Sequence, residues 1–369
     1  MYKKVILRSV WLCFAFICRQ SHAQSTKFVT DKFLYGASVY PEFQSKEEQI
    51  KMLDLFEKAD LTVLRLSESS WGNLEPEPGK FNFGWLRAFL DEMHKRKMKA
   101  ILGTSSYIVP QWLAANHPEI LWQYSDSSYS HPMGRHSVSR NHPLFRAHLE
   151  KYITAMGREF KDHPAVIGWQ LDNEIEANIA SRTDYNPVNR SSWTEWLEKN
   201  YKTADEFNRR LALVQWGLQI NSLKNVYLPS KVNESELPAL KLAHLKFQKD
   251  DVMEYFRWQR SLLEKAGVKH WITTDLNMVY YTVADEPRPD NPFDIMGLNE
   301  YQPTEDNPAY WASQSMFHDI HRSSNNKGTF LITETRIGPA GSERIWDAAA
   351  RTSNSLPGCC IQLLLGQAA

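Results

Sequence analysis

Cysteine is scarce in this sequence of 369 residues, and neither sign of charge is in excess. Of the four cysteines, two lie within the first 18 residues and the other two, Cys359 and Cys360, are adjacent. Neighbouring cysteines rarely bridge each other because the geometry is strained, so no disulfide framework is expected. The 43 basic and 43 acidic side chains balance, and no lysine- or arginine-rich block stands out. A nucleic acid or another polyanion is therefore not expected as a partner.

Motifs for metal ions and nucleotide cofactors are also missing. The sequence has no CxxC and no HExxH spacing, and no GxGxxG follows the first apolar run. His131, His136 and His142 share one stretch without a periodic ligand spacing, and we interpret them as facing solvent or a substrate. We expect neither a metal ion nor a cofactor.

Apolar runs of membrane-spanning length, about 20 residues, are absent as well. The run VILRSVWLCFAFIC, residues 5–18, follows two lysines, and the stretch RQSHAQ after it offers Ser21 and Ala23 at signal-peptidase spacing. We interpret residues 1–23 as a signal peptide. Residues 24–369 are then expected to form one exported domain, periplasmic or extracellular, without stable insertion in a membrane.

Two other interpretations of this N-terminal segment are weaker. A membrane anchor is disfavoured because the apolar run is too short to cross a bilayer. A lipidated Cys18 is disfavoured because the preceding AFI places a bulky phenylalanine where a small residue is expected.

Short apolar runs of strand length alternate with helix-patterned stretches along the rest of the chain. A strand followed by a helix, seven times over, predicts a parallel sheet with helices outside it. An open doubly wound sheet is the alternative, but the missing GxGxxG favours a (β/α)8 TIM barrel. The expected strands are 34–40, 61–67, 99–106, 165–174, 270–277, 293–301 and 329–336, and the clearest helical patterns are 46–60, 83–97 and 145–162.

Polar residues follow several of these strands at the same end. The run GWQLDNE, residues 168–174, is apolar around Trp169 and turns polar at Asn173 and Glu174. The same change recurs at Glu334 in LITETR, and in LRLSES and GLNEY. In a TIM barrel the strand body is buried and its carboxyl end delivers side chains to the active-site face. The sequence therefore predicts an active site at this end of the barrel.

Two glutamates at strand ends indicate glycosidic bond hydrolysis. One carboxylic acid protonates the leaving oxygen, and a second carboxylate meets the oxocarbenium-like carbon. Glu174 on the fourth strand is the predicted acid and then base, and Glu334 on the seventh is the predicted nucleophile. A separation of about 5 Å would give a retaining mechanism. The alternative is that either glutamate caps a helix or pairs with an arginine.

Three longer stretches resemble blocks of glycoside hydrolase family 42, the bacterial β-galactosidases. They are WGNLEPEPGKFNFGWL (71–86), ILGTSSYIVPQWLAANHPEIL (101–121) and DHPAVIGWQLDNE (162–174). The likeness extends from about residue 33 to residue 336. It implies cleavage of terminal β-D-galactosides in an oligosaccharide or polysaccharide by double displacement.

The resemblance also implies roles for single residues. It assigns the acid/base to Glu174, the nucleophile to Glu334 and a hydrogen bond to the sugar 2-hydroxyl to Asn173. Arg135 and Trp216 match positions that contact the sugar. A guanidinium holds hydroxyls in a fixed fork, and an indole stacks on an apolar sugar face.

Two further residues are predicted to support the nucleophile. Arg65, on the second strand, is expected to hold the charge of Glu334. Tyr301, on the sixth strand, is expected to donate a hydrogen bond to Glu334. The alternative for both is a buried network that only orders the barrel.

The end of the chain departs from the family pattern. Residues 337–369 form an atypical tail that could reflect truncation or a reading-frame error, so the eighth strand is expected to be atypical or missing. CCIQLLL is apolar enough to serve as that strand. The family implies a homotrimer, but the domain that builds it has no counterpart here. The alternatives are another retaining exo-glycosidase, acting on a β-glucoside or α-L-arabinopyranoside, and an inactive sugar-binding fragment.

Overall fold

The computed structural model describes most of the predicted barrel and an insert beside it. The described residues are 33–175, 183–229, 237–277, 291–300, 308–324, 329–335 and 362–366. The predicted signal peptide lies outside these ranges, and so does the atypical tail except for residues 362–366.

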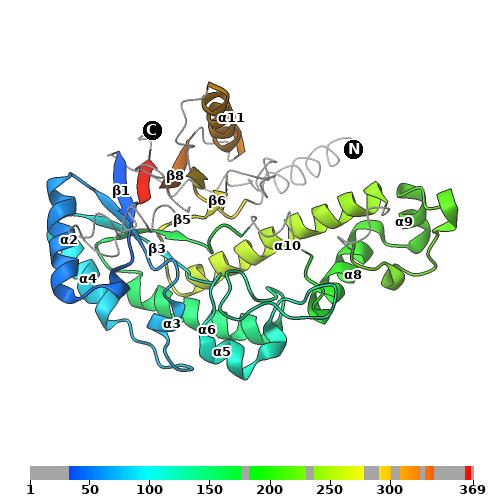
Figure 1. Ribbon diagram of the computed structural model, residues 1–369, viewed down its shortest axis with the longest axis horizontal. Helices are drawn as coiled ribbons and strands as arrows, with labels where there is room; N and C mark the ends of the chain where they lie inside the picture. Colours follow the sequence, from blue (N-terminus) through cyan, green and yellow to red (C-terminus); the bar gives the residue numbers. More distant parts are fainter. Residues whose placement is uncertain are drawn as a thin grey trace, which may run out of the picture.

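One sheet contains all the named strands (Figure 1). Its order is β5-β4-β3-β2-β1-β9-β8-β7-β6. The two outer strands, β5 and β6, are separated in the chain by Thr274 alone, so they form two halves of one stave and the sheet closes on itself. The strands are β1 (Leu34–Ser38), β2 (Val63–Leu66), β3 (Lys99–Gly103), β4 (Val166–Gln170), β5 (Trp271–Thr273), β6 (Asp275–Asn277), β7 (Met296–Glu300), β8 (Phe330–Thr335) and β9 (Gln362–Gly366).

The predicted TIM barrel is therefore confirmed, with eight staves around the ring. Each of the seven predicted strand regions contains an observed strand, and β1 to β4 pair in parallel in chain order. At the fifth position of the barrel, β5 pairs with β4 and β6 pairs with β7. Gly297 in β7 permits this bend, since a Cβ there would lie 2.0 Å from the Thr274 carbonyl oxygen.

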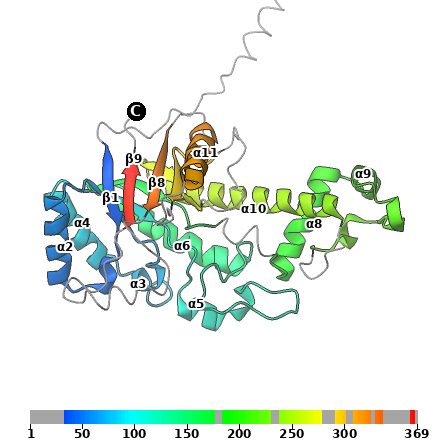
Figure 2. The same cartoon turned by 45° about the horizontal axis from the view of Figure 1, so that its top comes forward.

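The eighth stave is β9, and it is atypical as expected. Figure 2 shows it between β1 and β8. It runs antiparallel to both neighbours, with Leu34 opposite Gly366 in β1 and Ile332 opposite Leu365 in β8. This pairing satisfies backbone groups of β1 and β8 that would otherwise form open sheet edges.

Amphipathic helices cover the outside of the barrel. In α2, a capping box between Ser45 and Glu48 begins the helix, and Met52, Leu53 and Phe56 lie buried on one face. The helices of the barrel are α2 (Lys46–Lys58), α3 (Trp71–Leu74), α4 (Gly84–Lys95), α5 (Gln111–Asn116), α6 (Pro143–Phe160), α10 (Pro238–Lys265) and α11 (Pro308–Ser324), with 3-10 turns η1 (Pro41–Phe43) and η2 (Pro118–Ile120).

A helical insert follows the fourth strand and has its own core. Trp193, Leu197, Phe207 and Phe247 belong to this second cluster of buried side chains. Figure 1 shows α8 and α9 at the end of α10 that is distant from β1. The insert contains α8 (Pro187–Tyr201), α9 (Ala204–Arg210), η3 (Gln215–Gly217) and η4 (Leu223–Asn225). Among the described residues, no helix combines the length and apolar character needed to cross a bilayer.

Candidate active site

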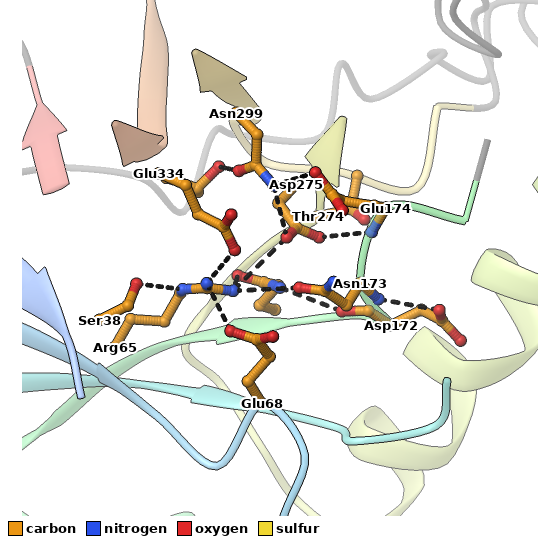
Figure 3. A network of polar contacts seen from close by, with 12 residues as sticks. Ser38, Arg65, Glu68, Asp172, Asn173, Glu174, Thr274, Asp275, Asn299 and Glu334 are labelled. Atoms are coloured by element: carbon orange, nitrogen blue, oxygen red, sulfur yellow. Dashed lines mark hydrogen bonds and ion pairs between the residues drawn. The ribbon is translucent and has the colours of Figure 1, made fainter. Parts of the chain in front are cut away.

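A buried arginine lies at the centre of the polar strand ends (Figure 3). Arg65 comes from β2 and is 1 % exposed. Its Nη2 donates to Glu334 Oε1 and, at 2.7 Å, to Glu68 Oε2. Burial acts to lower the pKa of Arg65, but the carboxylates of Glu334, Glu68 and Asp275 hold it well above the ordinary value. Its other acceptors among the described residues include Ser38 Oγ at 2.7 Å, Gln170 Oε1 at 3.0 Å and Asp275 Oδ2 at 3.4 Å.

Glu334 is aimed into the barrel by an irregularity in β8. The pairing with β7 passes from Leu298 opposite Ile332 to Asn299 opposite Glu334, so Thr333 is an extra residue on β8. Such bulges redirect side chains near active sites. The Thr333 hydroxyl donates to Asn299 Oδ1 at 2.8 Å, which fixes the bulge to the neighbouring strand.

Glu174 lies past the carboxyl end of β4, in a tight turn. Asp172 and Glu174 have φ of 56° and 45°, a left-handed conformation that is costly for residues other than glycine. The Asp172 carboxylate accepts from Asn173 N at 2.8 Å, and its own N–H donates to Thr104 Oγ1 at 2.9 Å. The Glu174 N–H donates to Asp275 Oδ1 at 3.1 Å. These hydrogen bonds stabilise the turn, which lies past the last residue of β4.

Among the described residues, each oxygen of the Glu174 carboxylate accepts a hydrogen bond from one donor. Arg135 Nη2 donates to Oε2 at 3.0 Å, and Asn299 Nδ2 donates to Oε1 at 3.0 Å. The Asn173 amide satisfies both its polar atoms when its nitrogen donates to Asp275 Oδ2 at 2.6 Å and its oxygen accepts from Arg135 Nη2 at 2.7 Å. The Arg135 side chain is 53 % exposed, in contrast to its buried neighbours.

The two glutamates thus belong to one connected network. One path runs from Glu174 through Asn299 to Thr333, the residue before Glu334. The other runs from the Glu174 N–H through Asp275 and Arg65 to Glu334. The polar ends of β2, β4, β7 and β8 therefore meet at one place, as predicted from the sequence, and Asp275 at the start of β6 joins them.

A second layer of hydroxyl groups holds Glu68. Tyr40 donates to its Oε2 at 2.7 Å and Tyr107 donates to its Oε1 at 2.9 Å. Burial, with the Glu68 carboxylate, raises the pKa of both phenols, so they remain protonated donors. The Arg135 guanidinium lies over the Tyr107 ring, 5.1 Å from its centroid.

The chain also matches a known protein family. The model of glycoside hydrolase family 42, described as beta-galactosidase, matches residues 38–355. The chain belongs to this family. It spans about half the length, or less, of the curated relatives that it matches. They include the beta-galactosidase BgaB of Geobacillus sp. strain Y412MC61, 26% identical over 341 residues, 87% of this chain and 49% of that protein.

Another curated relative is beta-galactosidase BgaH of Haloferax lucentense, 27% identical over 238 residues, 64% of this chain and 36% of its own length. Solved structures are similar in fold. The beta-galactosidase of the Antarctic haloarchaeon Halorubrum lacusprofundi has a TM-score of 0.75 at 25% identity, covering 86% of this chain and 50% of that one. The enzyme of the psychrophilic Marinomonas ef1 gives 0.75 at 24% identity, covering 82% and 48%.

For two predicted site residues of this family 42 chain, the structure does not describe the side chain. Tyr301 is outside the described residues, directly after β7. Trp216 has its backbone in η3, but its side chain is outside the description. Within the described ranges, no group of three or more His, Cys, Asp or Glu side chains is arranged to hold a metal ion.

The network members that were not predicted as site residues include Glu68, Asp275 and Asn299. Glu68 and Asn299 are in LRLSES and GLNEY, whose polar ends were recognised without assigning single residues. Asp275 lies within the expected strand, in the stretch TTDLN. A charged residue inside an apolar strand is the signal that could have indicated a site residue there.

Proposed function

We propose that this chain is the catalytic barrel of a retaining glycoside hydrolase that cleaves terminal β-D-galactosides. The observation that carries the proposal is the single buried network joining Glu174 and Glu334 across the carboxyl ends of β4 and β8. Family membership supports the reaction class, and the names of the two curated relatives described above, each a beta-galactosidase, support the sugar.

In the first step, Glu334 attacks the anomeric carbon and forms a glycosyl ester while the glycosidic bond breaks. Glu174 gives its proton to the leaving oxygen, so the aglycone departs as an alcohol. In the second step, Glu174 takes a proton from water, and the water oxygen displaces Glu334 from the sugar. Two inversions return the sugar with its original configuration.

The neighbours of each glutamate suit these tasks. Arg65 holds Glu334 ionised and fixes the direction of its carboxylate, which is the state a nucleophile needs. Arg135 is the exposed member of the network, so it is placed to bind sugar hydroxyls at the mouth of the site. We assign the 2-hydroxyl contact to Asn173 and the stacking wall to Trp216, both on the family resemblance.

We also propose that residues 1–23 direct export and are removed. The basis is the sequence pattern alone. Detection of a mature N-terminus near residue 24 in exported protein would support it, and full-length protein retained in the cytoplasm would overturn it.

The catalytic proposal is tested with a panel of nitrophenyl glycosides, after circular dichroism has shown that the purified protein is folded. Turnover of the β-galactoside is expected. Preference for a β-glucoside or an α-L-arabinopyranoside would keep the mechanism and change the substrate. A folded protein without turnover on any glycoside would overturn the proposal and leave a sugar-binding fragment.

A further inference from the structure

Asp275 occupies the centre of the site, and no role in the proposed reaction uses it. It begins β6, directly after the break at Thr274, and its side chain is fully buried. A fully buried carboxyl group is costly unless its hydrogen bonds are satisfied. The contacts of Asp275 therefore indicate what it is there to do.

Each oxygen of Asp275 meets donors, and three of its four contacts concern Glu174. Oδ1 accepts from the Glu174 N–H at 3.1 Å. Oδ2 accepts from Asn299 Nδ2 at 3.1 Å, and that same nitrogen donates to the Glu174 carboxylate. With the Asn173 amide in the orientation that satisfies both its polar atoms, Oδ2 also accepts at 2.6 Å from Nδ2 of Asn173, the residue before Glu174. The fourth contact is Arg65 Nη1, at 3.4 Å.

The turn at Glu174 needs an external constraint. Its φ of 45° lies in the left-handed region, where such a residue remains only if its surroundings fix it. The bond from the Glu174 N–H to Asp275 reaches across from another strand and supplies this constraint. A displacement of about 1 Å in a catalytic group can cost on the order of a hundredfold in rate.

We propose that Asp275 is a positioning residue for the acid/base, fixing the backbone and the flanking amides of Glu174 so that its proton points at the leaving oxygen. This inference rests on the proposed function. A positioning role differs from a purely structural role, because it predicts a loss of kcat/KM that depends on the leaving group of the substrate.

The charge of Asp275 is coupled to the same site. Burial raises the pKa of Asp275 well above its ordinary value; Arg65 opposes this, and Glu334, Glu174 and Glu68 add to it.

The test is Asp275→Asn, which keeps the size of the side chain. An amide accepts on one side only, so its nitrogen must face either the Glu174 N–H or the three donors on Oδ2. We expect kcat/KM for an alkyl or phenyl β-galactoside to fall by roughly 10–100-fold. For 2,4-dinitrophenyl β-galactoside, which needs little protonation, we expect a loss below about threefold.

Asp294→Asn is a matched control. Asp294 is also buried and accepts from a backbone N–H, Ile272 N at 3.0 Å, and from a guanidinium, Arg260 Nη1 at 3.2 Å. It precedes β7, at the opposite end from the glutamates. This variant should lose thermal stability without any split between leaving groups.

Three outcomes would overturn the inference while the proposed function stands. In Asp275→Asn, kcat/KM could fall equally on both substrates or not fall at all. In Asp294→Asn, kcat/KM could show the same difference between the two substrates. A wild-type protein without Glu334-dependent turnover would instead overturn the proposed function, and the inference with it.

Discussion

Glu334 sits within a strand, whereas Glu174 sits past the end of one. Glu334 is directed by a bulge in β8 and held by the charge of Arg65. Glu174 is directed by a left-handed turn and held by amides and by Asp275. A nucleophile must stay ionised, which a guanidinium favours. An acid/base must gain and lose a proton. Hydrogen bonds that can rearrange around the carboxyl group allow both protonation states.

The largest effect expected is from Glu334→Ala, which removes the proposed nucleophile. Turnover of every galactoside should fall by on the order of 10⁴-fold or more, because no covalent intermediate can form. Initial rates with aryl galactosides measure this. Added azide should restore turnover by occupying the vacated space, and the galactosyl azide should have inverted configuration. Residual wild-type-like turnover would place the nucleophile elsewhere.

Glu174→Ala should have a smaller and selective effect. Loss of general acid catalysis costs about 10²–10⁴-fold where the leaving group is poor. The kcat/KM for a dinitrophenyl galactoside should change little, since its leaving group needs little protonation. Equal losses on both substrates would contradict the acid assignment and remove the contrast between the two glutamates.

Asn173→Ala should reduce turnover by roughly tenfold or more, and should lower kcat more than it raises KM. A contact to the sugar 2-hydroxyl strengthens in the transition state, so its loss falls on the chemical step. The measurement compares kcat and KM on a galactoside with those on its 2-deoxy analogue. The analogue should be insensitive to the substitution; a pure rise in KM would argue against the contact.

The smallest effect concerns the pH dependence of stability. Burial raises the folded-state pKa of Asp275 above its unfolded value, so the folded protein holds this proton more tightly. Its contribution to stability is full below the unfolded pKa of about 4 and is lost as pH rises through the folded pKa. Asp275→Asn should flatten the fall of the unfolding free energy above pH 4, by at most about 1.4 kcal/mol per pH unit. Urea unfolding between pH 5 and 8 measures this; an unchanged slope would show that Asp275 is ionised in the folded state.

The sequence predicts the barrel well because the pattern that identifies each strand or helix lies within one short segment. The alternation of apolar runs and amphipathic stretches identifies seven of the eight strand positions, and the change from apolar to polar residues identifies the end of the barrel where the candidate site lies. The contact of Arg65 with Glu334 is predicted because their strand positions are known once the barrel is assumed. Each of these inferences needs only the strand periodicity and one topological rule.

Other features depend on contacts between distant segments. The predicted strand through Glu174 stops at Gln170, since the left-handed conformation of Asp172 is stabilised by Thr104 from the loop after β3 and not by its own neighbours. The role of Asp275 depends on partners from three other segments of the chain. The direction of β9 depends on its pairing with β1 and β8, which no local pattern encodes.

The position of β9 also has a consequence for the order of events during synthesis. One side of β1, at residues 34–38, pairs with residues 362–366, which leave the ribosome more than 300 residues later. At about 5–20 residues per second, that side of β1 waits on the order of 15–60 seconds for its partner. During this time the barrel is an open sheet, and its exposed edge is the part of the nascent chain that a chaperone would have to shield.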